Sequence, residues 1–174
     1  MRNYEKELEN RVAFIRKMLT DSGCEGIVYG NSGGKDSALV GILCKKACEN
    51  TVGILLPCAT TQNYGSDTDD ALRVAQQFGI AHRTVDLTET RGAVVAALEK
   101  SGVQLNNAAV SNIAPRLRMT ALYAIAAAEH RLVAGTGNRS EAFMGYCTKW
   151  GDAAADFNPI ADLSVTEVFE FLDY

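Results

Sequence analysis

The sequence predicts an α/β protein, a three-layer, doubly wound parallel sheet with helices on both faces. Short apolar runs, too brief for helices, alternate along the chain with longer stretches of helical periodicity. Strands that alternate with helices form parallel sheets joined by right-handed crossovers, which bury the strands between two helical layers. The 174 residues, 47% of them hydrophobic, suffice for one core of this kind. We therefore expect one domain over residues 1–174.

The first half of the chain supplies the opening helix and two strand–helix pairs. Residues 5–20 form an amphipathic helix, because apolar residues recur there at helical spacing (Leu8, Val12, Ile15 and Leu19). An apolar run over residues 26–29 predicts a first strand, and a helix is expected over residues 37–49. The pattern then repeats, with a strand at 51–56, a polar loop at 57–66 and a helix at 67–78 that Gly79 closes.

The second half of the chain continues the alternation. A third strand is expected over residues 82–87 and a helix over 90–100. After a loop rich in Asn and Gly, an alanine-rich helix is predicted over 115–130, followed by a short fourth strand at 132–134 and a last helix from Ser164. Ligands of doubly wound sheets bind beyond the carboxyl ends of the strands. One site should therefore be lined by the loops that follow the predicted strands, after Tyr29, Leu56, Leu87 and Ala134.

Charge and cysteine content exclude several classes of function. The 17 Lys and Arg against 21 Asp and Glu give a net charge of −4, so no basic surface for nucleic acid is expected. The polar start and the lack of a run of membrane-spanning length predict a cytoplasmic protein with no membrane partner. Five cysteines, none in a Cys-x2-Cys pair, indicate reduced thiols rather than a disulfide framework or a zinc ribbon.

The loop after the first strand is the strongest chemical signal. It reads Gly-Asn-Ser-Gly-Gly-Lys-Asp-Ser over residues 30–37 and opens a helix. Gly33 and Gly34 allow close backbone approach, and the helix start favours phosphate oxygens, so the loop predicts an anion cradle. It is not a Walker loop, because Asp36 separates the lysine from the serine. The plainer alternative is a glycine-rich turn in which Asp36 or Ser37 caps the helix.

This loop resembles the pyrophosphate loop of the ATP pyrophosphatase superfamily, whose members cleave ATP to AMP and pyrophosphate while adenylating a carbonyl oxygen. The resemblance implies a Rossmann-like fold of the adenine nucleotide alpha hydrolase type. It also implies a set of ATP-binding residues, namely Gly30, Ser32, Gly33, Gly34, Lys35, Asp36, Ser37 and Thr136. Thr136 follows the fourth strand, so its hydroxyl should lie in the same crevice as the loop.

Two further segments narrow the resemblance to ammonia-dependent NAD synthetase. They are residues 112–119, Asn-Ile-Ala-Pro-Arg-Leu-Arg-Met, and residues 135–141 with their continuation to 148–156. The resemblance implies that deamido-NAD is bound by Arg116, Lys149 and Asp156. It also implies that Asp36 and Glu141 bind Mg²⁺, a hard cation that takes one or two carboxylates beside substrate phosphates.

Each of these assignments has a plainer alternative. Arg116 and Arg118 lie two apart on a predicted helix and point to different faces, so one of them can be structural. Glu141 can be a solvated carboxylate in the first turn of a helix after Asn138. Lys149 and Asp156 can be an exposed pair on a loop, which would contribute little energy. Asp152 is assigned no role.

The implied reaction is the ATP-dependent amidation of deamido-NAD with ammonia to NAD, by way of an adenylate, with release of AMP and pyrophosphate. It requires positioning and charge neutralisation, and no covalent catalytic residue is assigned. The resemblance further implies a homodimer. The apolar face of the opening helix is a candidate interface, although burial in the core explains that face equally well.

Two departures from the family pattern keep other functions open. The family commonly has a lysine, near the ATP phosphates, where this sequence has Val165, and it continues with a further segment beyond the position of Tyr174. One alternative is another reaction of the superfamily, either GMP synthesis or tRNA thiolation. Cys58 and Cys147, in loops predicted to face the site, suit thiolation. The other alternative is a nucleotide-binding module without turnover.

Overall fold

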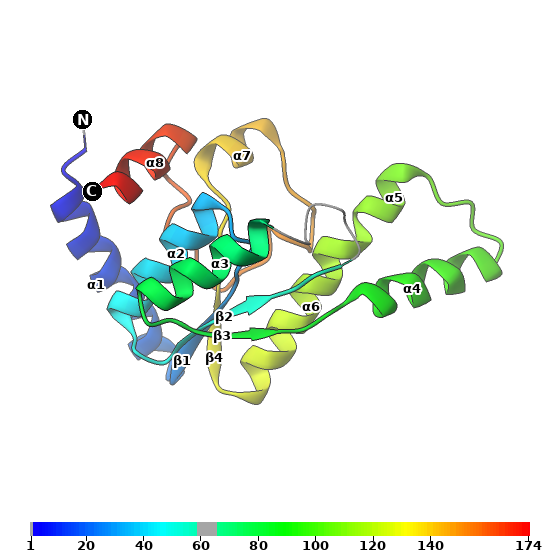
Figure 1. The fold of residues 1–174 in the computed structure, drawn as a ribbon, viewed down its shortest axis with the longest axis horizontal. Helices are drawn as coiled ribbons and strands as arrows, with labels where there is room; N and C mark the ends of the chain where they lie inside the picture. Colours follow the sequence, from blue (N-terminus) through cyan, green and yellow to red (C-terminus); the bar gives the residue numbers. More distant parts are fainter. Residues whose placement is uncertain (1, 59–65) are drawn as a thin grey trace.

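A parallel sheet forms the centre of the molecule, as the alternating sequence pattern predicts. The structure is a computed structural model and describes residues 2–58 and 66–174. The strands of this part are β1 (Gly26–Gly30), β2 (Thr51–Leu55), β3 (Ala81–Thr84) and β4 (Arg131–Ala134). They pair in parallel in the order β3-β2-β1-β4 (Figure 1). Val28 of β1 lies opposite Val52 of β2 on one side and Val133 of β4 on the other.

The order of the strands places a topological switch point beside β1. The chain moves outward from β1 through β2 to β3, then returns across the sheet to add β4 on the free side of β1. The loops after β1 and β4 therefore diverge from one another. Such a divergence at the carboxyl ends of parallel strands leaves a crevice in which ligands bind.

Helices cover both faces of the sheet. In chain order they are α1 (Tyr4–Ser22), α2 (Lys35–Ala47), α3 (Ser66–Gln77), α4 (Thr88–Lys100), α5 (Asn107–Ser111), α6 (Ile113–Ala128), α7 (Arg139–Met144) and α8 (Val165–Asp173). The α1, α2 and α8 helices share one core cluster with side chains from one face of the sheet. The α6 helix packs on the opposite face. The predicted three-layer, doubly wound architecture is confirmed.

Alternating side chains of β1 supply both cores. Ile27 and Tyr29 face the α1, α2 and α8 layer, whereas Val28 faces α6, and all three are fully buried. The ring of Tyr29 fits against two glycines. A Cβ atom on Gly41 of α2 would overlap the Tyr29 hydroxyl oxygen, and one on Gly53 of β2 would lie 2.9 Å from it. The two glycines therefore let the helix and the sheet approach around this ring.

Several boundaries differ from those that the sequence predicts. The α2 helix begins at Lys35 rather than Ser37, and β3 ends at Thr84 rather than Leu87. Beyond Thr84 the amide of Leu87 still donates to the carbonyl oxygen of Pro57 at 2.8 Å, but the chain then turns into α4. The short helix α5 was expected to be loop, and it forms because the Asn106 side chain accepts from the amide of Ala109 at 2.9 Å. Most of the predicted polar loop, residues 59–65, lies outside the described residues.

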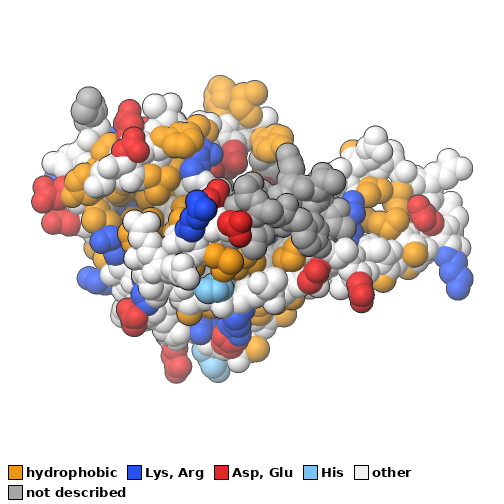
Figure 2. Space-filling model, in the orientation of Figure 1, with side chains coloured by type: hydrophobic (Ala, Val, Ile, Leu, Met, Phe, Trp, Pro, Cys, Tyr) orange, Lys and Arg blue, Asp and Glu red, His pale blue; other side chains and the backbone are white. Residues whose placement is uncertain are grey.

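The α4 and α5 helices form an arm that extends away from the sheet (Figure 1). Neither helix contains a buried residue. Hydrophobic side chains gather on the visible face of this arm (Figure 2), and Val103 in the turn between the helices is 46% exposed. None of the described helices combines the length and the hydropathy needed to cross a bilayer.

Candidate functional site

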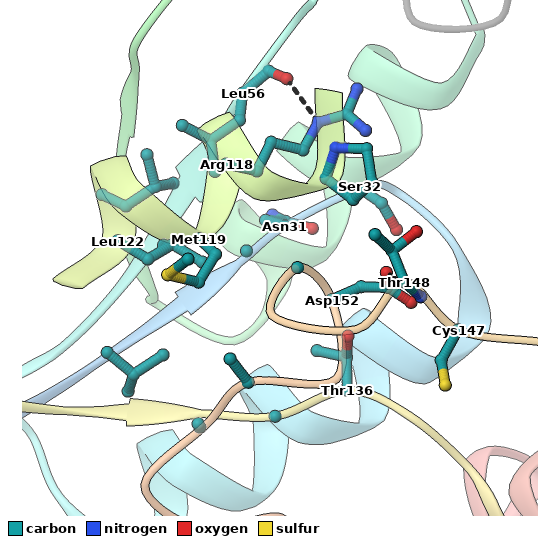
Figure 3. Close-up of a pocket in the computed structure, with 18 of the residues that line it drawn as sticks. Asn31, Ser32, Leu56, Arg118, Met119, Leu122, Thr136, Cys147, Thr148 and Asp152 are labelled. Carbon is teal, nitrogen blue, oxygen red and sulfur yellow. Dashed lines mark hydrogen bonds between the residues drawn. The ribbon is translucent and has the colours of Figure 1, made fainter. Parts of the chain in front are cut away.

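A cavity of about 660 Å³ opens at the carboxyl ends of β1, β2 and β4 (Figure 3). Its lining comes from the loops after these strands, from the start of α6 and from residues 145–154. The loop after β3 was also predicted to line the site, and this was wrong for the described residues, because none of its side chains reaches the cavity. The reason is topological. β3 is the strand farthest from the switch point, and α4 leads the chain away from it.

The glycine-rich loop reaches the start of α2 without a side-chain cap among the described residues. Gly33 has a φ angle of +82°, a left-handed conformation that favours glycine. Gly34 is the N-cap of α2, so Asp36 and Ser37 lie inside the first turn. The plainer alternative, in which one of them caps the helix, is therefore excluded. The Ser37 hydroxyl instead donates to the carbonyl oxygen of Gly34 at 2.9 Å. The positive end of the helix dipole therefore faces the loop, which suits an anion.

Asn31, which sequence reasoning passed over, holds this loop against the sheet. The residue is 5% exposed, and its amide N–H donates to the carbonyl oxygen of Ile54 at 2.8 Å. Its side-chain Nδ2 donates to the carbonyl oxygen of Ala71 at 3.3 Å, and its Oδ1 accepts from the amide of Gly33 at 3.3 Å. An asparagine that directly follows an apolar strand and precedes a glycine turn is the signal that could have identified it.

Asn138 joins the two predicted magnesium ligands. It is 1% exposed, and its Nδ2 donates to Asp36 Oδ1 at 3.1 Å. Its amide N–H donates to Glu141 Oε2 at 2.9 Å, while its own Oδ1 accepts from the amide of Glu141 at 3.0 Å, which closes a capping box at the start of α7. Residues 102 positions apart in the sequence, Asp36 and Asn138, thus meet at the switch point.

These two carboxylates fit a magnesium ion that also binds phosphate. Magnesium prefers hard oxygen ligands and commonly takes one or two carboxylates together with substrate phosphates. Both side chains contact the same residue, Asn138, and Asp36 lies in the first turn of α2 beside the anion cradle. Among the described residues, no three or more His, Cys, Asp or Glu side chains form a cluster that could hold a metal ion.

The predicted ATP-binding residues divide into two groups. Gly30, Ser32 and Thr136 line the cavity, and Thr136 lies opposite the glycine-rich loop across the switch point (Figure 3). The others, Gly33, Gly34, Lys35, Asp36 and Ser37, continue the loop into α2 outside the cavity lining. This division suits a long ligand that places one end in the cavity and a phosphate chain along the start of α2.

Arg116 and Arg118 point to different faces of α6, as their spacing predicts. Arg118 lines the cavity, and its Nε donates to the carbonyl oxygen of Leu56 at 2.9 Å (Figure 3). Burial lowers the pKa of the Arg118 guanidinium. Arg116 is exposed, lies outside the cavity lining and donates from Nε to the carbonyl oxygen of Lys149 at 3.2 Å. The arginine in the cavity is therefore Arg118, whereas the family resemblance implies a substrate contact for Arg116.

The segment that contains Lys149 and Asp156 packs beside the cavity. Lys149 is exposed next to Arg116, and its Nζ lies 5.7 Å from the ring centroid of Trp150. Trp150 has a φ angle of +59° and is 68% exposed, a strained conformation of the kind found near functional sites. Asp156 accepts from the amide of Val133 at 2.7 Å and from the Tyr123 hydroxyl at 3.2 Å, so it anchors the segment to β4 and α6.

The two cysteines expected to face the site lie in different environments. Cys58 is fully buried, and its thiol donates to the carbonyl oxygen of Leu87 at 3.8 Å, so the prediction that it faces the site was wrong. The residue follows β2 by only a few positions and packs into the α6 core, where burial raises its pKa. Cys147 is exposed and lines the cavity. Of the two cysteines, Cys147 therefore remains a candidate for thiolation and Cys58 does not.

Comparison with known proteins identifies the family. The sequence model of NAD synthase matches residues 7–174. The chain belongs to the NAD synthase family. An NH3-dependent NAD synthetase of Carboxydothermus hydrogenoformans is 41% identical over 174 residues, which cover 99% of this chain and 70% of that relative.

Solved structures of the NAD synthase family share the fold described above. The NH3-dependent NAD synthetase of Campylobacter jejuni superposes with a TM-score of 0.91 at 33% identity, over all of this chain and 74% of that one. An NMN synthetase of Francisella tularensis superposes with a TM-score of 0.92 at 32% identity, over all of this chain and 71% of that one. The Rossmann-like fold that the sequence resemblance implied is confirmed.

Proposed function

We propose that this chain is a ligase that amidates deamido-NAD with ammonia to give NAD, at the expense of ATP cleaved to AMP and pyrophosphate. The observation that carries the proposal is the link from Asp36 through Asn138 to Glu141 at the switch point. It places a carboxylate pair beside the uncapped start of α2 and next to a cavity large enough for a nucleoside. Membership of the NAD synthase family supports the same reaction.

In this proposal the adenosine of ATP occupies the cavity and its phosphates follow the glycine-rich loop. Ser32 and Thr136 lie in the lining and would contact the nucleotide, and the amides of Gly33 and Gly34 lie along the path of the phosphates. Asp36 and Glu141 would hold Mg²⁺. When bound, Mg²⁺ would neutralise phosphate charge and make pyrophosphate a better leaving group.

The chemical step requires the nicotinate carboxylate of deamido-NAD to attack the α-phosphorus of ATP. An oxygen–phosphorus bond forms, pyrophosphate leaves, and ammonia then displaces AMP from the adenylate, with loss of a proton, to form the amide. Positioning of two polyanions is the main task of the protein. Arg118 lies at the cavity wall and would contribute positive charge there.

Deamido-NAD is proposed to lie on the surface beside the cavity. Arg116 and Lys149 are exposed neighbours there, since the Arg116 guanidinium donates to the Lys149 carbonyl oxygen. Pro115 and Thr148, the residues that precede them, both line the cavity, so a dinucleotide bound by these cations could extend its acid end inward. The role of Asp156 as a substrate contact remains a prediction from the resemblance.

A homodimer is also part of the proposal, but through a different surface from the one that the sequence suggested. The apolar side chains of α1, including Ile15, pack into the core, so that face is not available. The arm of α4 and α5 instead exposes hydrophobic side chains to solvent, and a second copy that covers them would remove this surface from water. Residues 1–174 are proposed to act as one functional unit in each copy, and a cytoplasmic location remains a prediction.

The proposed reaction is tested by mass spectrometry of its products. The chain is incubated with Mg²⁺, ATP, ammonium and deamido-NAD, and AMP and NAD are measured together, with a matched reaction that omits ammonium. Equimolar NAD and AMP are expected. ATP binding without either product would contradict the proposal and favour a nucleotide-binding module.

A parallel reaction distinguishes the two substrates suggested by the structural relatives. One of these is an NMN synthetase, so nicotinate mononucleotide is supplied in place of deamido-NAD. The exposed pair Arg116 and Lys149 provides charge for a second phosphate and favours the dinucleotide. Faster turnover of the mononucleotide would reassign the substrate while leaving the amidation reaction intact.

A further inference from the structure

The turn at residues 148–152 holds the indole ring of Trp150 out to solvent. Trp150 is 68% exposed, and its φ angle of +59° is one that residues other than glycine rarely adopt. Hydrogen bonds within the turn fix this conformation. The amide of Thr148 donates to Asp152 Oδ1 at 2.8 Å, and the amide of Gly151 donates to the Thr148 carbonyl oxygen at 2.9 Å. The turn itself therefore imposes the backbone conformation that exposes the ring.

Contacts with the start of α6 fix the same turn from outside. The Lys149 carbonyl oxygen accepts from Arg116 Nε at 3.2 Å. Gly151 is buried, and a Cβ atom on it would lie 3.1 Å from Pro115 Cβ. The residues on both sides of Trp150 thus pack onto the helix, whereas the indole does not. A strained backbone and an exposed apolar ring both cost free energy, and such strain is concentrated at sites that bind ligands.

The surroundings of the indole suit a ligand that is both anionic and aromatic. The Lys149 ammonium lies 5.7 Å from the centroid of the Trp150 ring, and Arg116 is exposed beside Lys149. Thr148 and Gly151, on either side of the Lys149–Trp150 pair, line the cavity. Cations bind phosphates, and an uncovered aromatic ring stacks on a nucleobase. Together they provide the contacts that a nucleotide needs at the mouth of the cavity.

We infer that Trp150 is the residue on which the adenine ring of deamido-NAD stacks. The inference rests on the proposed function, because it assigns a contact to the substrate of that reaction. Deamido-NAD has an aromatic ring at each end, and its nicotinate end must reach the α-phosphorus of ATP. The phosphates lie between the two ends, so their contact with Arg116 and Lys149 leaves the adenosine outside the cavity, where the indole is uncovered.

This contact makes Trp150 a residue that determines specificity. Nicotinate mononucleotide has the same acid end as deamido-NAD but no adenine, so it gains nothing from the indole. Stacking of a base on an aromatic side chain contributes enough free energy to favour the dinucleotide about tenfold. The preference for the dinucleotide therefore comes from a ring outside the cavity rather than from the groups that surround the reacting carboxylate.

Tryptophan fluorescence tests the contact without requiring turnover. Trp150 is the single tryptophan of the chain, so the emission reports on this ring alone. In the absence of ATP and Mg²⁺, deamido-NAD should quench most of the emission, whereas the same concentration of nicotinate mononucleotide should leave it nearly unchanged. Titration calorimetry on the same samples measures binding. Binding of deamido-NAD without quenching would overturn the inference, and so would equal quenching by the mononucleotide, which would place the nicotinate ring on the indole.

Trp150→Gly separates binding from folding, because glycine removes the ring and accepts the positive φ angle without strain. The midpoint of thermal unfolding should not fall. Affinity for deamido-NAD should fall by about tenfold, and affinity for nicotinate mononucleotide should stay the same. Trp150→Phe, which keeps an aromatic ring, should retain the affinity for deamido-NAD to within about threefold.

Phe143→Ala is the matched control. It removes an aromatic ring that is 87% exposed on α7, and it should change neither affinity by more than about twofold. Unchanged binding of deamido-NAD by Trp150→Gly, or equal losses for both ligands, would overturn the inference. A parent chain that binds no deamido-NAD would overturn it as well. A chain that shows the expected quenching but forms no NAD would refute the proposed reaction and leave this inference standing.

Discussion

The crevice between β1 and β4 and the edge formed by β3 and α4 are built from the same unit, a parallel strand followed by a loop and a helix. At the crevice the strands are buried, and two nearly inaccessible asparagines, Asn31 and Asn138, hold the loops. At the edge every residue of β3 is exposed and α4 buries none. The difference shows that the position of a unit relative to the switch point, rather than the unit itself, decides whether its loop forms a site.

The largest difference in activity should come from neutralising one carboxylate in the first helical turn of each region. Asp36→Asn in α2 is expected to lower kcat/KM for AMP release by about 100-fold to 1,000-fold, because it removes a negative ligand beside the phosphate chain. Glu89→Gln in the first turn of α4 is the matched change at the edge and should leave kcat/KM unchanged. Similar losses of kcat/KM in both variants would show that activity depends on surface carboxylates in general rather than on the one in the crevice.

The next largest difference is in stability and concerns two asparagines that cap helices, Asn138 and Asn106. Asn138→Ala removes the cap of α7 and leaves Asp36 without its buried amide partner, so the free energy of unfolding should fall by about 2 to 3 kcal/mol. Asn106→Ala removes only the exposed cap of α5 and should cost about 1 kcal/mol. Urea unfolding followed by circular dichroism measures both values. Equal costs would mean that the Asn138 side chain does no more than cap its helix.

Replacing a glycine by alanine should change the free energy of unfolding in opposite directions in the two regions. Gly33→Ala places a Cβ atom on a residue whose backbone is left-handed, so it should cost about 1 to 2 kcal/mol of unfolding free energy and weaken ATP binding. Gly92→Ala in α4 meets open space in a helix and should stabilise the chain by about 0.5 to 1 kcal/mol. Thermal unfolding compares them, and a loss of stability in Gly92→Ala would show that the arm requires a glycine.

The smallest effect concerns an ion pair at the edge and depends on pH. Both oxygens of Glu129 accept from Arg83 of β3, at 2.7 and 2.8 Å, and Arg131 of β4 donates to the same carboxylate. These contacts, that with Arg83 foremost, lower the pKa of Glu129 from 4.5 to about 2. Its contribution is therefore complete above pH 4.5 and is lost as the pH falls toward 2.

Glu129→Gln tests this dependence. Near neutral pH the variant should lose about 0.5 to 1 kcal/mol of unfolding free energy, since the pair is partly exposed. The difference from the parent chain should shrink below pH 4.5 and vanish only below about pH 2, where the carboxyl is protonated in the folded chain as well. If the two unfolding free energies still differ at the lowest pH, the loss in Glu129→Gln comes from packing rather than from charge.

Sequence reasoning was most successful where the chemistry is local. Apolar runs and their glycine-rich loops predicted the parallel sheet, the two helical layers and three of the four loops expected at the site. The start of α2 was placed two residues late because Asp36 and Ser37 are good caps in general, whereas here Gly34 takes that position. The Asn106 cap that starts α5 lay within a segment whose composition is typical of a loop.

The rest of the site depends on contacts between distant residues. Asn138 could be identified as a helix cap from its spacing to Glu141, but its contact with Asp36 exists only in the folded chain. Arg118 faces the cavity and Arg116 faces solvent because of how α6 lies on the sheet, which their spacing alone does not determine. The exclusion of the β3 loop likewise follows from the order of the strands.

The close fit of Tyr29 against Gly41 and Gly53 links three positions on three elements. A side chain at either glycine would overlap the tyrosine ring, and a smaller residue at position 29 would leave a void between helix and sheet. We therefore expect substitutions at these three positions to occur together rather than singly. In any lineage that exchanges the tyrosine for a smaller residue, we expect larger residues to become tolerated at both glycines.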